Sequence, residues 1–138
     1  MNLIYDILGQ YKTSDNDAVM FDIDDTLISS EDGAIIFESL RILKRARILG
    51  YKIVIITARS PDGAEYTSTQ LGLAGIPYDT LIFSPAHMKG RAKQTTGHRY
   101  VLSVGDLPTD CTYSIFSLKL PEMLLTGPQP IQLEERFW

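Results

Sequence analysis

Short apolar runs alternate with longer stretches of helical periodicity along this chain, and no other feature constrains the fold as strongly. The clearest runs lie at residues 18–21, 52–57 and 80–83. They are continuous, as in strands that are covered on both faces. Further short runs at 100–104 and 117–120 extend the series. The sequence therefore predicts an α/β fold: a three-layer, Rossmann-like core with a mostly parallel sheet.

The stretches between these runs carry helix signals. The helices that we expect cover residues 34–49, then a segment from a turn at 60–63 to about residue 73, then residues 86–95. Pro108 suits the first turn of a further short helix. The segment 15–17 (Asp-Asn-Asp) reads as a turn with a helix-capping aspartate. The tail after Pro121 is expected to wrap the surface. Its apolar residues are expected to pack on the core, in preference to forming a subunit contact: Ile131, Leu133, Phe137 and Trp138.

Composition limits the architecture and the compartment. With 138 residues, 44% of them hydrophobic, we expect a single domain over residues 1–138. The first residues carry no basic region, and no apolar run approaches the roughly 18 residues of a membrane span. We therefore expect a soluble, cytoplasmic protein with no membrane partner. The only cysteine, Cys111, excludes an internal disulfide and a cysteine-based zinc site.

Charge gives a weaker constraint on partners. The net charge of −4 disfavours non-specific binding of nucleic acid. However, residues 80–105 contain no acid, and they leave room for a local basic groove. The basic residues of this segment are Lys89, Arg91, Lys93 and Arg99.

Polar side chains follow the ends of several expected strands. The acidic run 22–26 (Asp-Ile-Asp-Asp-Thr) comes directly after the first strand, Thr57 ends the second, and Gly105 and Asp106 follow the fourth. Because ligands of open α/β sheets bind outside the carboxyl ends of the strands, we expect these side chains to converge on one crevice.

This ordered set of motifs resembles the haloacid dehalogenase-like (HAD) phosphatases. The corresponding residues are the run 22–26, Thr57, a lysine at 89 or 93, and the segment 105–110 (Gly-Asp-Leu-Pro-Thr-Asp). Within that superfamily, the segments 97–106 and 116–121 look most like the acid-phosphatase branch. The resemblance implies a metal-dependent phosphomonoester hydrolase that works through an aspartyl-phosphate.

The chemistry of the residues agrees with the resemblance. A carboxylate can attack phosphorus if a cation offsets the negative charges, and aspartate oxygens suit Mg²⁺. The resemblance assigns Asp22 as the nucleophile and Asp24 as the general acid and base. Thr57 and Lys89 would hold the phosphoryl group, and Thr26 would contact the substrate. Arg59 follows Thr57 by two residues and could also reach the substrate, although a surface ion pair fits it equally. The expected ligands of Mg²⁺ are Asp22, Asp24, Asp106 and Asp110.

Two positions need separate comment. Asp25 stands where the family commonly has glycine, and we interpret it as tolerated. Spacing does not choose between Lys89 and Lys93 for the phosphate-binding lysine. We favour Lys89, because it falls at the beginning of the expected helix and therefore nearer the crevice. Met20, Tyr51 and Phe83 are expected to be core or strand residues.

The gaps between the motifs predict that no cap domain is present. Each gap has room only for the helix and strand of one crossover. By resemblance, an open site points to a bulky or macromolecular phosphorylated substrate, such as a nucleic-acid end or a phosphoprotein. It equally fits an oligomer whose neighbouring subunit closes the site.

Other functions fit the same residues. One is a phosphate-binding or regulatory module without useful turnover, and another is transfer of the phosphoryl group to an acceptor other than water. A receiver-type signalling domain also combines an acidic pair, an acceptor aspartate, a threonine and a lysine. Its acceptor aspartate would follow a later strand, however, and the order of motifs here argues against it.

Overall fold

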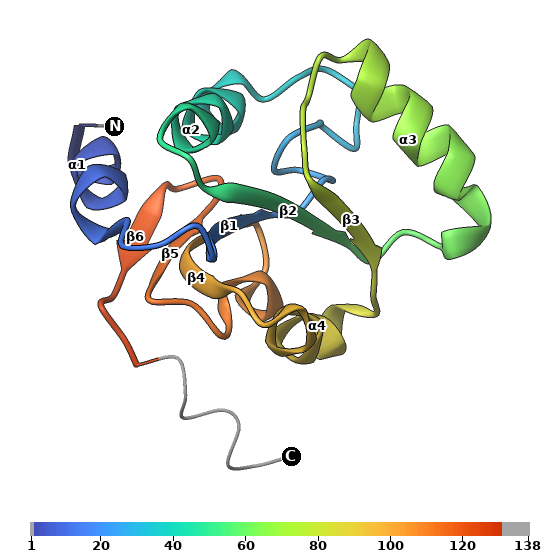
Figure 1. Cartoon of the computed structure of the whole chain (residues 1–138). Helices are drawn as coiled ribbons and strands as arrows, with labels where there is room; N and C mark the ends of the chain where they lie inside the picture. The colour runs from blue at the N-terminus through green and yellow to red at the C-terminus, as the bar shows by residue number, and fades with distance from the viewer. Residues whose placement is uncertain (1, 131–138) are drawn as a thin grey trace.

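One mixed sheet forms the centre of the molecule. In the computed structural model, which describes residues 2–130, six strands lie in the order β3-β2-β1-β4-β5-β6 (Figure 1). Neighbouring strands are parallel except β5 and β6. The predicted α/β fold with a mostly parallel sheet is confirmed. The strands are β1 (Asp17–Phe21), β2 (Lys52–Thr57), β3 (Thr80–Phe83), β4 (Arg99–Gly105), β5 (Phe116–Lys119) and β6 (Leu124–Thr126).

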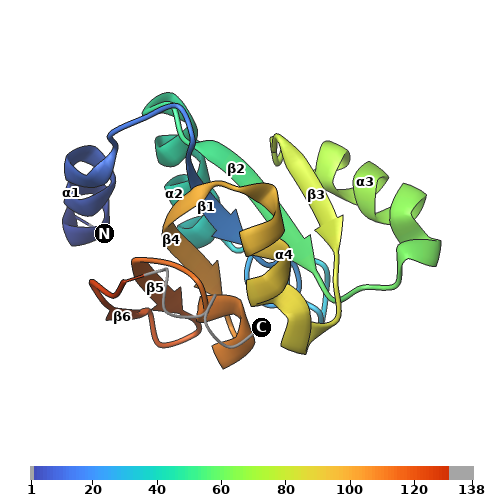
Figure 2. The same cartoon turned by 60° about the horizontal axis from the view of Figure 1, so that its bottom comes forward.

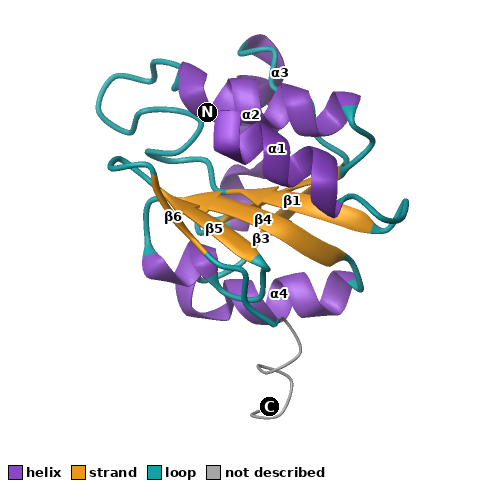
Figure 3. Cartoon of the chain, turned by 90° about the vertical axis from the view of Figure 1, so that its left-hand side faces the viewer, coloured by secondary structure: helices purple, strands orange, loops and turns teal. Residues whose placement is uncertain are grey.

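Helices cover both faces of this sheet and make the fold three-layered. Helices α1, α2 and α3 lie on one face and α4 lies on the other (Figure 3). Figure 2 shows α4 in front of the strands. The helices are α1 (Asn2–Tyr11), α2 (Phe37–Ile48), α3 (Ala64–Leu73) and α4 (Lys89–Thr96), with short 3₁₀ turns η1 (Pro61–Gly63), η2 (Ala86–Met88) and η3 (Pro108–Cys111). None of these described helices is long and apolar enough to cross a membrane.

The central strands are apolar throughout because each contributes to two cores. In β1, Val19 and Phe21 belong to the larger core, which also contains buried residues of α1 and α2. Ala18 and Met20 point to the opposite face and pack in a smaller core with Tyr100. Since successive side chains of a strand alternate between faces, a strand buried on both faces reads as one continuous apolar run.

The connections between the strands make the strand order of the sheet reverse between β1 and β4. The chain passes from β1 through α2 to β2, and through α3 to β3. It then crosses the other face through α4 and returns to β4, which pairs with β1. Each of these connections contains only one α-helix with its loops and 3₁₀ turns. The reversal between β1 and β4 is the place where open α/β sheets bind ligands, at the carboxyl ends of the strands.

Several elements differ from the prediction. Helix α1 and strand β6 were not expected, although Ile4, Ile7 and Leu8 of α1 are buried at helical spacing. Helix α2 begins at Phe37 rather than at residue 34, because Ile35 forms a bridge with Ile28 and holds this segment extended. The segment 86–95 begins as the 3₁₀ turn η2. The apolar residues expected to pack on the core at 131–138 lie outside the described residues.

The turn expected in the segment 15–17 is present, but strand β1 follows it, so the expected helix cap was wrong. Asp17 is the first residue of β1, and it is fully buried. Its carboxylate accepts hydrogen bonds from the backbone N–H groups of Thr13 and Ser14 at 2.6 and 3.1 Å and from Nε of Arg99 at 2.9 Å. Burial opposes the charge, but these donors outweigh it and lower the pKa of Asp17 to about 2. Asp17 therefore joins the turn after α1 to the beginning of β4.

Candidate active site

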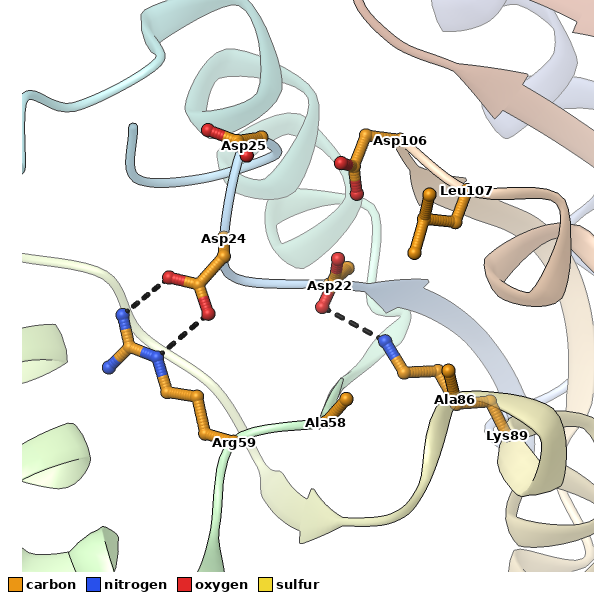
Figure 4. A pocket seen from close by; sticks show the side chains of 9 residues that line it. All are labelled: Asp22, Asp24, Asp25, Ala58, Arg59, Ala86, Lys89, Asp106 and Leu107. Atoms are coloured by element: carbon orange, nitrogen blue, oxygen red, sulfur yellow. Dashed lines mark hydrogen bonds and ion pairs between the residues drawn. The ribbon is translucent and has the colours of Figure 1, made fainter. Parts of the chain in front are cut away.

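Asp22 lies where β1 ends beside β4. Its backbone N–H donates to the carbonyl oxygen of Val104 at 3.0 Å, which continues the pairing of β1 with β4 by one residue. Asp22 is only 6% exposed, yet it lines a cavity of about 320 Å³. Figure 4 shows it in the middle of the residues around that cavity. The cavity is lined by Asp22, Asp24, Asp25, Ala58, Arg59, Ala86, Lys89, Asp106 and Leu107.

Three carboxylates gather at this point. Oxygens of Asp22, Asp106 and Asp110 all lie within 4.8 Å of one another. Asp106 follows β4 directly, and Asp110 lies in η3 and is fully buried. Burial and the neighbouring charge of Asp110 raise the pKa of Asp22 to about 7, and burial also raises the pKa of Asp106. Negative charge on this carboxylate cluster is therefore costly unless a cation is nearby.

Lys89 supplies one positive charge to this cluster. It is the first residue of α4 and is 1% exposed. Its Nζ donates to Oδ1 of Asp22 at 3.0 Å and to Oδ1 of Asp110 at 2.6 Å. Burial disfavours the ammonium, but the charges of these two carboxylates outweigh that effect and raise the pKa of Lys89. Lys89 is therefore the lysine that contacts the candidate nucleophile.

Lys93 has a different position. It lies one turn further along α4 and is also fully buried. Its Nζ donates to Oγ of Ser103 at 2.9 Å and to the backbone carbonyl oxygen of Asp110 at 2.6 Å. The two lysines thus hold Asp110 from two sides, Lys89 through the carboxylate and Lys93 through the backbone. Lys93 does not line the cavity.

The carboxylate cluster fits a hard divalent cation. With all groups ionised, three carboxylates and one ammonium carry two net negative charges. Oδ1 of Asp106 is buried and has no hydrogen-bond partner among residues 2–130. A buried carboxylate oxygen without a partner is costly, and a metal ion would satisfy it. Asp22, Asp106 and Asp110 are the side chains that could hold such an ion.

Asp24 is not part of this cluster. It lies on the other side of the cavity, where its carboxylate faces the guanidinium group of Arg59 (Figure 4). Nη2 and Nε of Arg59 donate to the two Asp24 oxygens at 2.8 and 3.0 Å. The hydrogen bonds with Asp24 are also the main reason that the pKa of Arg59 is raised. Asp24, expected both as a metal ligand and as a general acid, is here held by an arginine.

Two residues of α3 fix the other end of Arg59. Nη1 donates to Oε1 of Gln70 at 2.7 Å and to Oγ1 of Thr67 at 3.2 Å. Four of the five N–H groups of Arg59 are therefore used within the protein. Arg59 was predicted as a substrate contact, but its two partners on α3 were not predicted. Gln70 follows Arg59 by eleven residues, and no motif marks it.

The two candidate threonines are buried beside the cavity. Thr57 and Thr26 are both fully buried, and neither lines the cavity. Oγ1 of Thr57 accepts a hydrogen bond from the backbone N–H of Arg59 at 3.1 Å. Oγ1 of Thr26 has no hydrogen-bond partner in the part of the chain that the structure describes. Their assigned contacts with a substrate stay predictions.

Local backbone conformation explains the residue types at two positions. Asp25 has a φ of 59°, in the left-handed region that glycine and, less readily, aspartate adopt. Its carboxylate accepts hydrogen bonds from the N–H and hydroxyl of Ser30, which supports the turn. At Gly105, an added Cβ would lie 2.2 Å from Cβ of Asp110. Asp110 can therefore reach the cluster only because residue 105 has no side chain.

The basic segment 80–105 does not form an exposed groove. Lys89 and Lys93 are buried as described above, and Arg99 binds Asp17. Of the four basic residues in this segment, only Arg91 is classed as exposed. The charges that suggested a nucleic-acid surface are mostly used to organise the acidic residues of the protein itself.

The fold is of the α/β class with an acidic site at the reversal of strand order, and a comparison with protein families finds a match. A model of the haloacid dehalogenase-like hydrolase family matches residues 19–83. This segment contains Asp22, Asp24, Thr57 and Arg59, and it ends with β3. This match supports membership of the haloacid dehalogenase-like hydrolases. The acid-phosphatase branch is not distinguished by this match and stays a prediction.

A solved structure supports the same fold. One chain of the structure described as a Pnkp1/Rnl/Hen1 complex is similar, with a TM-score of 0.63 and 20% sequence identity. The match covers 72% of the present chain and 42% of the other, so the present chain spans less than half of that relative. At this identity the likeness concerns the fold alone. No match was found among curated proteins.

Proposed function

We propose that this protein is a magnesium-dependent phosphomonoester hydrolase that forms an aspartyl-phosphate on Asp22. The observation that carries the proposal is the position of Asp22 itself. It lines the cavity, its carboxylate contacts Lys89, and it lies within 4.8 Å of oxygens of Asp106 and Asp110. With Lys89 and a bound cation offsetting the negative charge of the cluster, the Asp22 carboxylate could approach a phosphate dianion.

The positions of the side chains around the cavity support the following roles. Asp22 attacks phosphorus, and the bond from phosphorus to the leaving oxygen breaks. Asp24 gives its proton to that oxygen. It then takes a proton from the water that attacks the phosphoryl-enzyme and releases phosphate. Lys89 donates to the phosphoryl oxygens and stabilises their charge. Asp22, Asp106 and Asp110 would hold Mg²⁺, which when bound supplies charge neutralisation and orientation of the phosphoryl group.

The size of the substrate is a further part of the proposal. The connections between the strands contain only α2, α3, α4 and their loops and 3₁₀ turns, so no inserted domain covers the cavity in the described residues. An open cavity admits a phosphate at the end of a bulky molecule, such as a nucleic-acid end or a phosphoprotein. Efficient hydrolysis of small sugar phosphates by a monomer would contradict this part.

One observation favours a second candidate function. Both carboxylate oxygens of Asp24 are bound by Arg59, and a general acid needs one of them for a proton. If neither of these two hydrogen bonds is released when substrate binds, the protein would bind phosphate with little turnover. It would then act as a phosphate-binding module of the same fold.

Hydrolysis of an aryl phosphate separates the two functions. The wild type and Asp22→Asn are assayed with Mg²⁺ and again with excess EDTA, and binding of orthophosphate is measured by calorimetry. We expect metal-dependent release of phosphate by the wild type and a loss of at least about 1000-fold in Asp22→Asn. Binding of orthophosphate and Mg²⁺ without hydrolysis above the level of the variant would support the binding module instead.

A further inference from the structure

A second cavity of about 380 Å³ adjoins the candidate active site. The two cavities share Ala58 and Arg59, so they meet at the residues that follow β2. The second cavity extends from there towards the end of β3. It is lined by Ala58, Arg59, Ser60, Pro61, Phe83, Ser84 and Pro85.

The sheet fixes the walls of this second cavity. Thr57 pairs with Phe83 in the register of β2 and β3, and the N–H of Ser84 donates to the carbonyl oxygen of Thr57 at 2.9 Å. The loops after the two strands therefore leave the sheet side by side. Phe83, expected as a core or strand residue, is the last residue of β3; it is partly exposed and lines the cavity.

The chemistry of the walls is that of a site for a flat apolar group. Three of the lining residues carry rings, namely Phe83, Pro61 and Pro85, and no carboxylate is among them. The one charged residue is Arg59. Its in-plane hydrogen bonds to Asp24, Gln70 and Thr67 use four of its N–H groups. What Arg59 still offers a ligand is mainly its planar face, on which aromatic rings stack.

The position of Asp24 relates this cavity to the reaction. The phosphoryl group belongs with Asp22, Lys89 and Asp106, on the side away from Arg59 (Figure 4). The leaving oxygen must meet Asp24, which is bound to Arg59. The rest of the leaving group then continues past Arg59, in the direction of Phe83.

We infer that the cavity between residues 58–61 and 83–85 binds an aromatic ring of the leaving group, such as an aryl group or a nucleobase. The inference rests on the proposed phosphohydrolase activity and names the part of the substrate that the protein selects. Stacking on the ring of Phe83 and on the planar face of Arg59 would each favour an aromatic ring at this place.

Kinetics with two substrates test this assignment. Phenyl phosphate carries a ring in its leaving group, and acetyl phosphate does not. In Phe83→Ala we expect kcat/KM for phenyl phosphate to fall about 10-fold, and kcat/KM for acetyl phosphate to change less than about 2-fold. Phe83→Leu retains apolar volume without the ring and should fall in between. Phe37→Ala removes an aromatic ring that is 55% exposed on α2, outside both cavities, and should change neither substrate.

The outcomes distinguish a failure of the cavity assignment from a failure of the proposed phosphohydrolase activity. Equal losses for both substrates in Phe83→Ala, or no loss for either, would overturn the assignment of the cavity while the phosphohydrolase activity stands. If the wild type hydrolyses neither substrate, the proposed function fails first and the assignment falls with it. Thermal unfolding of Phe83→Ala and Phe83→Leu identifies a variant that lost activity only because it is unfolded. The Leu variant keeps the test decisive in that case.

Discussion

The guanidinium group of Arg59 binds both carboxylate oxygens of Asp24, at 2.8 and 3.0 Å. The pair connects the loop after β2 with the loop after β1 across the mouth of the cavity. Such a two-point contact fixes the orientation of the carboxylate as well as its place. Arg59 thus orients Asp24, and Gln70 and Thr67 of α3 in turn orient Arg59.

Gln70→Leu should lower kcat without a comparable change in KM. The substitution removes the acceptor of the 2.7 Å hydrogen bond from Arg59, so that Arg59 and Asp24 lose their fixed orientation. The loss of a hydrogen bond to a charged group corresponds to about a 10-fold fall in kcat. Gln70→Glu keeps an acceptor at this position and should retain most of the activity. Steady-state kinetics of both variants check this, and equal losses in both would argue that Gln70 acts only on stability.

Gly105→Ala should abolish activity by displacing Asp110. The new Cβ would lie 2.2 Å from Cβ of Asp110, so η3 must move and its carboxylate must leave Asp22 and Lys89. Crowding of this kind also destabilises a fold by about 1–3 kcal/mol.

Gly72→Ala is the matched control, because its Cβ would meet nothing within 4 Å in α3. It should be neutral or stabilise by roughly 0.5–1 kcal/mol. Urea unfolding and phosphatase assays of the two variants compare the sites, and an active Gly105→Ala protein would contradict the geometry of the cluster.

Asp17 should make stability depend on acid pH. Its pKa is lowered in the folded protein to about 2, below the usual 3.8, so the stabilisation is present above about pH 4 and is lost as the pH falls through about 2. Because Arg99 is partly exposed, we expect Asp17→Asn to cost roughly 1–2 kcal/mol at pH 7. The difference between wild type and variant should shrink as the pH approaches 2.

Asp15→Asn removes a fully exposed acid two residues away and should show no such trend. Urea unfolding between pH 2 and pH 7 measures both, and a constant difference would rule out the Asp17–Arg99 pair as its source.

The strands and the centre of the site could be predicted from the sequence because they depend on local signals. A strand buried on both faces is continuous and apolar, and parallel strands end at the same edge, so Asp22 and Asp106 had to come close. The choice of Lys89 over Lys93 rested on position along the helix, and the structure places Lys89 against Asp22.

The remaining features depend on contacts between distant residues, which local patterns do not carry. Arg59 binds Asp24, 35 residues before it, and Gln70, 11 residues after it, and no repeat or motif has these spacings. Likewise, nothing in the sequence pairs Arg99 with Asp17, which lies 82 residues away. Phe83 fits the pattern of a core strand residue. That it lines a cavity depends on how the loops after β2 and β3 lie side by side, which no local pattern marks.

The most direct test of the central claim is to trap the phosphoryl-enzyme. The wild type and Asp22→Asn are mixed with an aryl phosphate and Mg²⁺, quenched in acid within milliseconds, digested and analysed by mass spectrometry. We predict one phosphoryl group on the wild-type peptide that contains Asp22, sensitive to hydroxylamine as an acyl phosphate is, and none in the variant. Release of phosphate by the wild type without a phosphorylated peptide, or a phosphoryl group on another residue, would contradict the account.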